Sequence, residues 1–172
     1  VYVPATPGAP CVQRRINENY ELCQPEYGYY ISKHEITNAQ WASFLNEVAS
    51  YTDPAGLWTS SMQISRTNDG ISNTWLYAAD EGYENHPVTH VGFANAAKFA
   101  NWMTSDSISE GIYHRLNTNK YYTTRGYNAT DEILNWAGAG GVALPTLNEW
   151  YKAAYFYPSD YSHMWVPGHS GN

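Results

Sequence analysis

The residues that most often carry metal or redox chemistry are few in this chain and lie far apart. Its 172 residues include six histidines and two cysteines, whereas copper, iron and zinc sites need such ligands gathered at one point. His86 and His90 are four residues apart on one face of an expected strand, where that separation spans about 13 Å. Loop histidines explain this spacing better than a metal pair. The sequence therefore predicts no metal-ligating residue.

The two cysteines suit a structural role. Cys11 and Cys23 lie twelve residues apart near the N-terminus, and neither a histidine nor a third cysteine flanks them, as a zinc site would require. In an oxidising compartment, a disulfide that closes this loop would stabilise the fold by roughly 3 kcal/mol on a chain-entropy model. We predict a disulfide between Cys11 and Cys23, with two free thiols as the alternative.

No pair of residues has the spacing of an acid–base or nucleophilic site. Lys33 and Glu35 are interpreted as an ion pair at a helix start, and Glu149 as part of a helix cap. The chain also lacks the glycine-flanked serine of hydrolases, the phosphate-binding loop and the calcium-binding loop. The sequence predicts no catalytic residue and leans against an enzyme without deciding the question.

Charge and hydropathy exclude two kinds of partner. Sixteen acidic residues outnumber nine basic ones, which argues against nucleic acid because its binding depends on lysine and arginine. No apolar run approaches the ~20 residues of a membrane helix, so no membrane span is expected.

Aromatic residues favour a protein or glycan partner. The chain has 16 tyrosines and 7 tryptophans, and both residue types are enriched at contact surfaces. Filling the core of a loop-rich domain is the alternative role for them. The aromatic residues expected to be exposed on loops and to contact a partner are Trp58, Trp75, Tyr77, Tyr121 and Tyr122.

Three short helices are expected to form the scaffold. Two of them begin at capping boxes, in which a threonine is followed three residues later by a glutamine or glutamate: Thr37 with Gln40, and Thr146 with Glu149. Apolar residues then recur at the spacing of one helix face. The expected helices span residues 37–50, 93–103 and 147–156.

Strands are expected to be few and short. Residues 29–33 and 87–91 are rich in β-branched or aromatic side chains and are the candidates. Residues 1–28 are expected to be extended and loop-like, because four prolines bar a helix. Residues 51–85 and 104–140 are interpreted as long loops, the first with room for one short strand pair.

Three segments, in this order, resemble the formylglycine-generating-enzyme (sulfatase-modifying factor) family. They are residues 30–41 (YISKHEITNAQW), 86–96 (HPVTHVGFANA) and 144–154 (LPTLNEWYKAA). The third closely matches the Leu-Pro-Thr-Glu-x-Glu-Trp-Glu-x-Ala-Ala signature of that family, and residues 1–5 are similar to its Val-Pro-Ala-Gly opening. The resemblance implies a single domain, residues 1–172, with an irregular, C-type-lectin-like α+β fold of about three short helices, short strands and long loops.

The chain departs from the family at its C-terminal end. Family members continue past the Glu-Trp helix with a Gly-Asn-Val-Trp-Glu-Trp stretch, calcium ligands and, in formylglycine generators, a cysteine pair that binds copper. None of these precedes Asn172, and Cys11 and Cys23 lie in the wrong part of the fold to be that pair. We therefore expect a domain truncated at its C-terminal end relative to the family, with calcium or copper only if a further part exists.

Fold signatures without chemistry favour a non-catalytic binding or assembly module, including a subunit of a larger extracellular assembly. Abundant tyrosine, serine and asparagine with little lysine are typical of secreted, periplasmic or cell-surface proteins, so we expect an extracytoplasmic location. The alternative is a fragment of a metal-dependent oxidative enzyme of the formylglycine-generating type. Such an enzyme would act on a peptide, and its catalytic residues would lie beyond residue 172.

Overall fold

Two compact units make up the chain. The computed structural model describes residues 1–5, 12–16, 18–22, 25–68, 70–115, 122–124 and 141–155. The terminal unit is formed by residues 1–33 together with 145–172, and the central unit by residues 34–144. The terminal unit is thus built from both ends of the chain.

The central unit begins with helix α1, Asn38–Val48, at the residue that the sequence indicates. The Gln40 N–H donates to Thr37 Oγ1 at 3.3 Å, and the Thr37 N–H donates to Gln40 Oε1 at 2.9 Å, so the predicted capping box is confirmed. The helix ends at Val48, shortly before the expected end at residue 50. Its buried apolar residues recur at helical spacing and form the centre of the core: Trp41, Ala42, Phe44 and Leu45.

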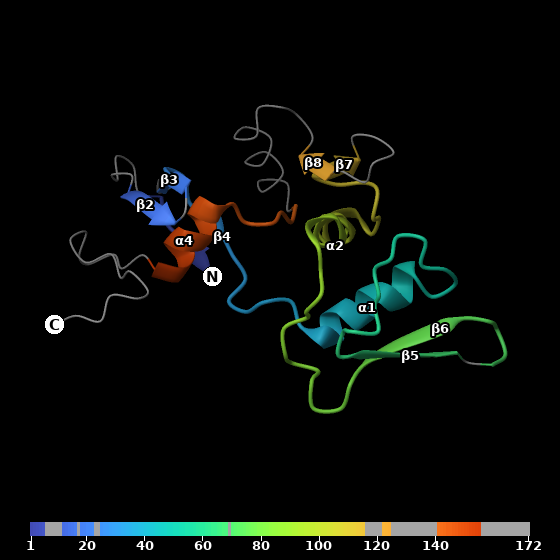
Figure 1. Ribbon diagram of the computed structural model, residues 1–172. Helices are drawn as coiled ribbons and strands as arrows, with labels where there is room; N and C mark the ends of the chain where they lie inside the picture. Colours follow the sequence, from blue (N-terminus) through green and yellow to red (C-terminus); the bar gives the residue numbers. More distant parts are fainter. Residues whose placement is uncertain are drawn as a thin grey trace. The chain divides into compact units, whose positions relative to one another are not determined.

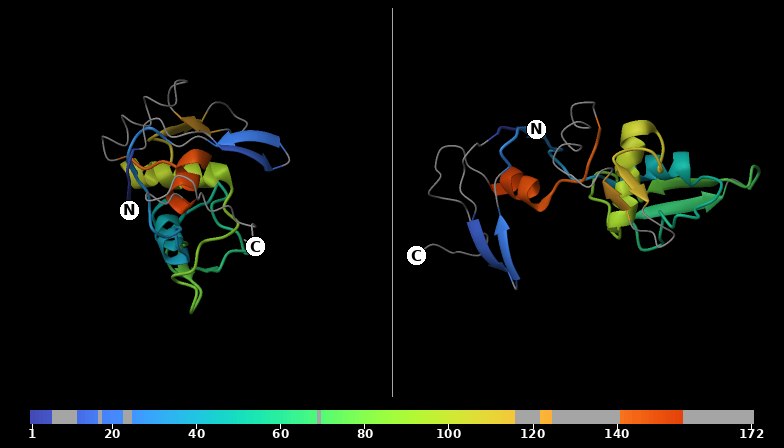
Figure 2. Two further views of the ribbon diagram at one scale, coloured as in Figure 1. Left: turned by 90° about the vertical axis from the view of Figure 1, so that its left-hand side faces the viewer. Right: turned by 90° about the horizontal axis from the view of Figure 1, so that it is seen from above.

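A β-hairpin packs along α1 (Figure 1; Figure 2). Strands β5, Ile64–Asn68, and β6, Trp75–Ala79, pair antiparallel with Arg66 opposite Tyr77. This is the strand pair for which the sequence left room within residues 51–85. Ile64 and Tyr77 are buried in the core that α1 also lines.

Helix α2, Phe93–Ser105, adds Phe99 to this core. The Phe99 ring lies 5.1 Å from that of Trp41 and 5.2 Å from that of Phe44, between ring centroids. A second buried cluster lies along the alanine-rich side of α2 and comprises Ala97, Ala100, Ile112 and Tyr113. The strand pair that follows α2 consists of β7, Tyr113–Arg115, and β8, Tyr122–Thr124.

Residues 87–91 do not form the strand that the sequence predicted. An isolated bridge joins Pro87 to Thr37, and the Val88 N–H donates to the Ile36 carbonyl at 2.9 Å. Proline has no N–H to donate to a ladder, and His90 has a positive φ of 60°, which ends the extended path. The segment is therefore irregular up to the start of α2.

The terminal unit contains one helix and two antiparallel strand pairs in its described part (Figure 1). The β2–β3 hairpin, within residues 12–22, occupies a region expected to be loop-like. Proline excludes a helix there but lies outside both strands, so it does not prevent this pairing. Strand β4 is shorter than the expected 29–33. The elements are β1, Tyr2–Val3, paired with β4, Tyr29–Tyr30; β2, Val12–Ile16, paired with β3, Glu18–Leu22; and helix α4, Leu147–Tyr155.

The α+β class predicted from the sequence is confirmed. Across the described residues, three helices and small antiparallel strand pairs are joined by irregular segments. None of the described helices is long and apolar enough to cross a membrane.

Candidate functional site

Trp58 and Trp75, which the sequence analysis expected to be exposed on the loop of residues 51–85, meet around Arg66. Trp75 lies instead in strand β6. The guanidinium carbon of Arg66 lies 4.1 Å from the ring centroid of Trp58 and 4.2 Å from that of Trp75. A guanidinium over an indole face is attracted to the electrons of the ring, and tryptophan gives the strongest such contact. All three side chains are half-buried. We call this arrangement the Trp–Arg–Trp stack.

The turn before β5 fixes the position of Trp58. The Asp53 carboxylate accepts hydrogen bonds from the backbone N–H groups of Leu57 at 2.8 Å and Trp58 at 2.9 Å. At the other end of the side chain, Trp58 Nε1 donates to the Ile64 carbonyl at 2.8 Å. Both the backbone and the indole of Trp58 are therefore held, and the indole lies at the outer edge of β5.

Tyr77 supports the stack from the core and is not an exposed binding residue. Its side chain is 2 % exposed, so the expectation that it is exposed on a loop is wrong. Tyr77 Oη donates to the Ala49 carbonyl at 3.2 Å. Burial raises the pKa of the Tyr77 hydroxyl, and the positive charge of the nearby Arg66 opposes that rise. Tyr77 is buried because it lies on the side of β6 that faces α1.

The Asn46 side chain on α1 bonds the edge of β6 that faces away from β5, as a neighbouring strand would. Its Nδ2 donates to the Tyr77 carbonyl at 2.8 Å, and its Oδ1 accepts from the Tyr77 N–H at 2.8 Å. The Trp75 N–H likewise donates to the Ser50 carbonyl at 2.6 Å. The backbone groups of Tyr77 and Trp75 therefore point away from β5.

This register determines which groups of β5 face outward. In an antiparallel pair, residues opposite each other alternate between pairs that exchange hydrogen bonds and pairs that do not. The Arg66–Tyr77 and Asn68–Trp75 pairs do not exchange hydrogen bonds. The backbone N–H and C=O groups of Arg66 and Asn68 therefore point away from β6. Within the described residues, no backbone partner bonds these groups. The outer edge of β5 is thus open at Arg66 and Asn68.

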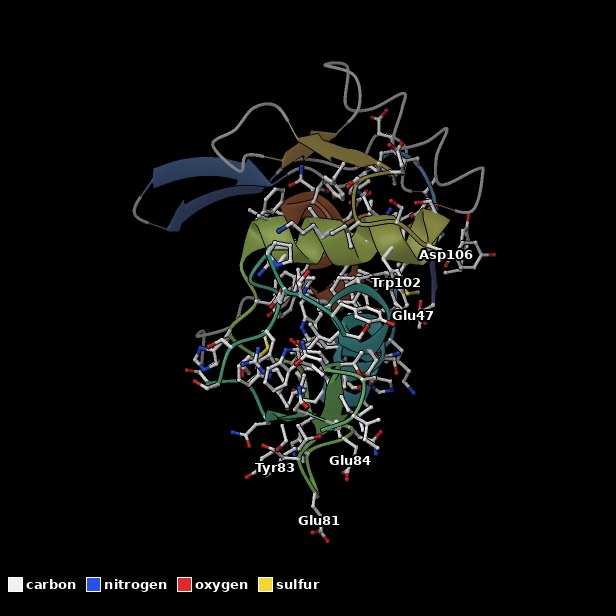
Figure 3. The ribbon with its side chains drawn as sticks, turned by 90° about the vertical axis from the view of Figure 1, so that its right-hand side faces the viewer. Glu47, Glu81, Tyr83, Glu84, Trp102 and Asp106 are labelled. Carbon is white, nitrogen blue, oxygen red and sulfur yellow. The ribbon has the colours of Figure 1, made fainter. Side chains whose placement is uncertain are left out.

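The surface of the central unit carries several carboxylates. Figure 3 shows Glu81, Tyr83 and Glu84 on the turn that follows β6. It also shows Glu47 beside Trp102, whose indole N–H donates to the Glu47 carboxylate at 3.0 Å. These carboxylates create a negative potential that disfavours polyanions.

Arg66 is a half-buried cation in this acidic unit. The structure describes two Lys or Arg side chains in the central unit, Arg66 and Lys98, and Lys98 is buried. Lys98 Nζ lies 3.1 Å from Asn95 Oδ1, so it is engaged inside the unit. Of these two basic groups, Arg66 is therefore the better placed to contact an anionic ligand.

A second polar cluster lies in the terminal unit around Glu149. The predicted cap is confirmed, because the Glu149 N–H donates to Thr146 Oγ1 at 3.2 Å and its carboxylate accepts from the Thr146 N–H at 2.6 Å. Tyr27 Oη also donates to Glu149 Oε1 at 2.9 Å, and Tyr29 Oη donates to the Glu149 carbonyl. Lys152 Nζ donates to the carbonyls of Pro4 and Pro25. The sequence analysis missed these long-range contacts.

The terminal cluster is a structural clamp. Lys152 is 2 % exposed, and burial lowers its pKa. A desolvated amine can act as a nucleophile, but this amine is enclosed and directed at two carbonyls of the N-terminal segment. The hydrogen bonds of Lys152, together with that from Tyr29 to the Glu149 carbonyl, attach residues 1–5 and 25–29 to α4. The cluster therefore explains how the two ends of the chain form one unit.

Alkaline pH is expected to destabilise the terminal unit through Tyr29. Burial raises the pKa of Tyr29 from its ordinary value of 10.0 to about 12, and raises the pKa of Tyr27 further. Because these folded-state pKa values exceed those of the unfolded chain, the stabilisation is fully present below pH 10 and lost as the pH rises toward 12. The lowered pKa of Lys152 has the opposite effect on stability. Because the unfolded chain keeps the Lys152 proton more readily than the folded protein, stability rises with pH up to 10.5.

Urea unfolding measured from below pH 10 up to pH 12 checks this expectation. Tyr29→Phe should show a shallower loss of stability with pH than the wild type. Tyr30→Phe, which alters a tyrosine that is 83 % exposed, serves as the matched control and should follow the wild type. Equal slopes for all three proteins would contradict the assignment.

The remaining predicted site residues lie outside what the structure describes in detail. Tyr121 is outside the described residues, and Tyr122 begins β8 without a described side chain. Cys11 and Cys23 are also outside the described residues, so their disulfide remains a prediction. Within the described residues, no three histidine, cysteine, aspartate or glutamate side chains gather to hold a metal ion.

Comparison with known proteins identifies a family. The model of the sulfatase-modifying factor enzyme 1-like domain matches residues 17–165, a span that includes all three segments in which the resemblance was seen. No curated protein and no solved structure matches the chain. Because the family match extends over well more than half of the residues, the chain belongs to the family of sulfatase-modifying factor enzyme 1-like domains.

Proposed function

We propose that this chain is a non-catalytic, extracytoplasmic binding module whose contact surface is the Trp–Arg–Trp stack at the outer edge of β5. The observation that carries the proposal is the position of Arg66, held 4.1 Å and 4.2 Å from two indole centroids at an open strand edge. Tryptophan and arginine are the residue types that most often dominate binding energy at interfaces.

The stack is ordered before any ligand binds. Asp53 and Ile64 hold Trp58 through the hydrogen bonds described above, and Arg66 lies against the faces of both indoles. Binding to a surface that is already ordered avoids much of the entropy cost of fixing long side chains. This preorganisation favours a binding role over a purely structural one, because the side chains of the stack are only partly buried and remain accessible for contact.

The buried polar groups of the scaffold support a structural role away from this surface. Glu149 and Lys152 are engaged in capping and clamping, and Asn46 completes the β6 edge. Such groups stabilise the fold and are not placed to react with a substrate. The extracytoplasmic location follows from composition, as argued from the sequence.

Screening identifies the ligand and tests the proposal. The full 172-residue chain would be screened against a glycan array and a displayed peptide library. Probes that bind the wild type should bind Trp75→Ala and Arg66→Ala at least about tenfold more weakly. Trp150→Ala, which removes an aromatic ring that is 47 % exposed in the terminal unit, is the control and should bind normally.

Folding must be checked for each variant, because Trp58 and Trp75 also pack against the core. A moderate fall in melting temperature is expected for Trp75→Ala, whereas Arg66→Ala removes no core side chain. Normal binding by Arg66→Ala would overturn the proposal. Loss of binding in the Trp150→Ala control would also overturn the proposal, because it would indicate that the probe does not bind through the Trp–Arg–Trp stack alone.

Family membership favours a second candidate function. The chain would then be part of a metal-dependent oxidative enzyme of the formylglycine-generating type, with its catalytic residues beyond residue 172. Copper uptake by the complete gene product, with oxidation of a cysteine-containing peptide, would support this alternative. A complete product that leaves such a peptide unchanged would favour the binding module.

A further inference from the structure

We infer that the partner of the Trp–Arg–Trp stack is an extended peptide that pairs with the outer edge of β5 and places one carboxylate beside Arg66. The inference rests on the proposed function and names the class of partner for the same surface. It follows from the register of the hairpin, the position of Trp58 and the charge of the unit.

The edge of β5 offers backbone groups to a further strand. The N–H and C=O of Arg66 and Asn68 point away from β6, because Asn46 bonds the backbone of Tyr77 on the opposite edge. A strand edge with unpaired N–H and C=O groups is a template for an added strand. Proteins use this geometry to bind extended peptides, with backbone bonds giving affinity and side chains giving specificity.

Trp58 sets the limit of the edge. Its Nε1 donates to the Ile64 carbonyl, so that carbonyl is already taken and the indole occupies the edge at this position. An added strand would therefore pair with Arg66 and Asn68 and then meet the ring of Trp58. The open edge is thus short and defined in register, which is what specific recognition of a peptide requires.

Side-chain alternation determines what lies beside the guanidinium. In an antiparallel pair, the residue directly opposite Arg66 has its side chain on the same face, with the two Cβ atoms about 5 Å apart. On that face, the guanidinium is fixed between Trp58 and Trp75. A carboxylate matches the fork of guanidinium donors, and the resulting charged hydrogen bonds are about twice as strong as neutral ones. The peptide residue opposite Arg66 is therefore an aspartate or glutamate.

Charge excludes two competing occupants. A second copy of β5 paired in this register would place Arg66 against Arg66, and like charges directly opposite each other are destabilising. A polyanion would meet the carboxylates of Glu81 and Glu84 on the turn after β6 (Figure 3). A peptide with one carboxylate in an otherwise neutral extended segment avoids both penalties.

Selection from a displayed heptapeptide library tests the inference. Peptides that bind the full chain would be selected and counter-selected against Arg66→Gln, which keeps a long polar side chain but removes the charge. The expected result is a consensus with an acidic residue at one fixed position. Replacing that residue by its amide in a synthetic peptide should weaken binding by about tenfold. The same change should have little effect on binding to Arg66→Gln.

Hydrogen exchange shows whether the peptide adds to the edge. On binding of the selected peptide, the amides of Arg66 and Asn68 should become protected, whereas the Ser65 amide, which faces β6 in the existing ladder, should be unchanged. A peptide with an N-methyl group at the position that pairs with Arg66 should fail to bind. Arg66→Lys should recover part of the affinity, because lysine keeps the charge without the planar fork.

Failure of this inference can be told from failure of the proposed function. If glycans or other probes bind through the Trp–Arg–Trp stack while no acidic peptide is selected, the inference is overturned and the proposed function stands. Peptide binding without protection of Arg66 and Asn68 overturns strand addition in the same way. If no probe depends on Arg66, both are overturned.

Discussion

Replacing Asn101 with leucine is expected to lower the free energy of unfolding by about 3–5 kcal/mol. Asn101 is fully buried on α2. Its Nδ2 donates to the Tyr113 carbonyl at 2.7 Å and to the Ile108 carbonyl at 3.3 Å, and its Oδ1 accepts from the Tyr113 N–H at 2.9 Å. Leucine is of similar size but bonds none of these groups. Each buried polar group left without a partner costs about 1–3 kcal/mol.

Equilibrium urea denaturation measures this loss. Asn85→Leu is the matched control, because Asn85 is exposed and surface substitutions usually change stability by less than about 0.5 kcal/mol. A loss below about 1 kcal/mol in Asn101→Leu would contradict the assigned role of the amide. The same bidentate contact recurs between Asn46 and Tyr77, so α1 and α2 each hold a strand in this way.

Replacing Phe44 with alanine is expected to lower the free energy of unfolding by about 3–5 kcal/mol. Phe44 is 0 % exposed, and its ring centroid lies 5.1 Å from that of Trp41, 5.2 Å from that of Phe99 and 5.3 Å from that of Trp102. Deleting the ring removes its apolar burial and leaves a cavity among rigid aromatic neighbours that cannot collapse into the space. Both effects destabilise the core.

Phe93→Ala provides the control for Phe44→Ala. Phe93 begins α2 and is 59 % exposed, so the same deletion should cost less than about 1 kcal/mol. Denaturation followed by tryptophan fluorescence reports both variants, since Trp41 and Trp102 surround the Phe44 position. Similar losses for the two variants would contradict the assignment of Phe44 to the centre of the core.

The helices were predictable because their signals are local. The capping box of Thr37 with Gln40 and that of Thr146 with Glu149 are contained within four residues each, so the sequence defines them without knowledge of the fold. The β2–β3 hairpin and the irregular path of residues 87–91 were missed. Strand pairing depends on which distant segment lies alongside, and His90 adopts a left-handed backbone that side-chain type does not reveal.

The candidate site was partly predictable. Trp58 and Trp75 were named because their residue types favour contact surfaces, and the structure brings them together. Arg66 was missed because its role depends on the hairpin register, which places it between two rings from different segments. Tyr77 was misplaced, since residue type alone does not show which side of β6 faces α1. The roles of Asn46 and Asn101 are equally hidden, because an amide that bonds a distant backbone looks like any other polar residue.

The affinity of Arg66→Ala for the best probe from the screens tests the central claim most directly. Isothermal titration would compare it with the wild type and with Tyr83→Ala, which alters a tyrosine that is 45 % exposed on the acidic turn. The proposed contact surface predicts binding at least about tenfold weaker for Arg66→Ala and unchanged for Tyr83→Ala. Wild-type affinity in a folded Arg66→Ala protein would contradict it.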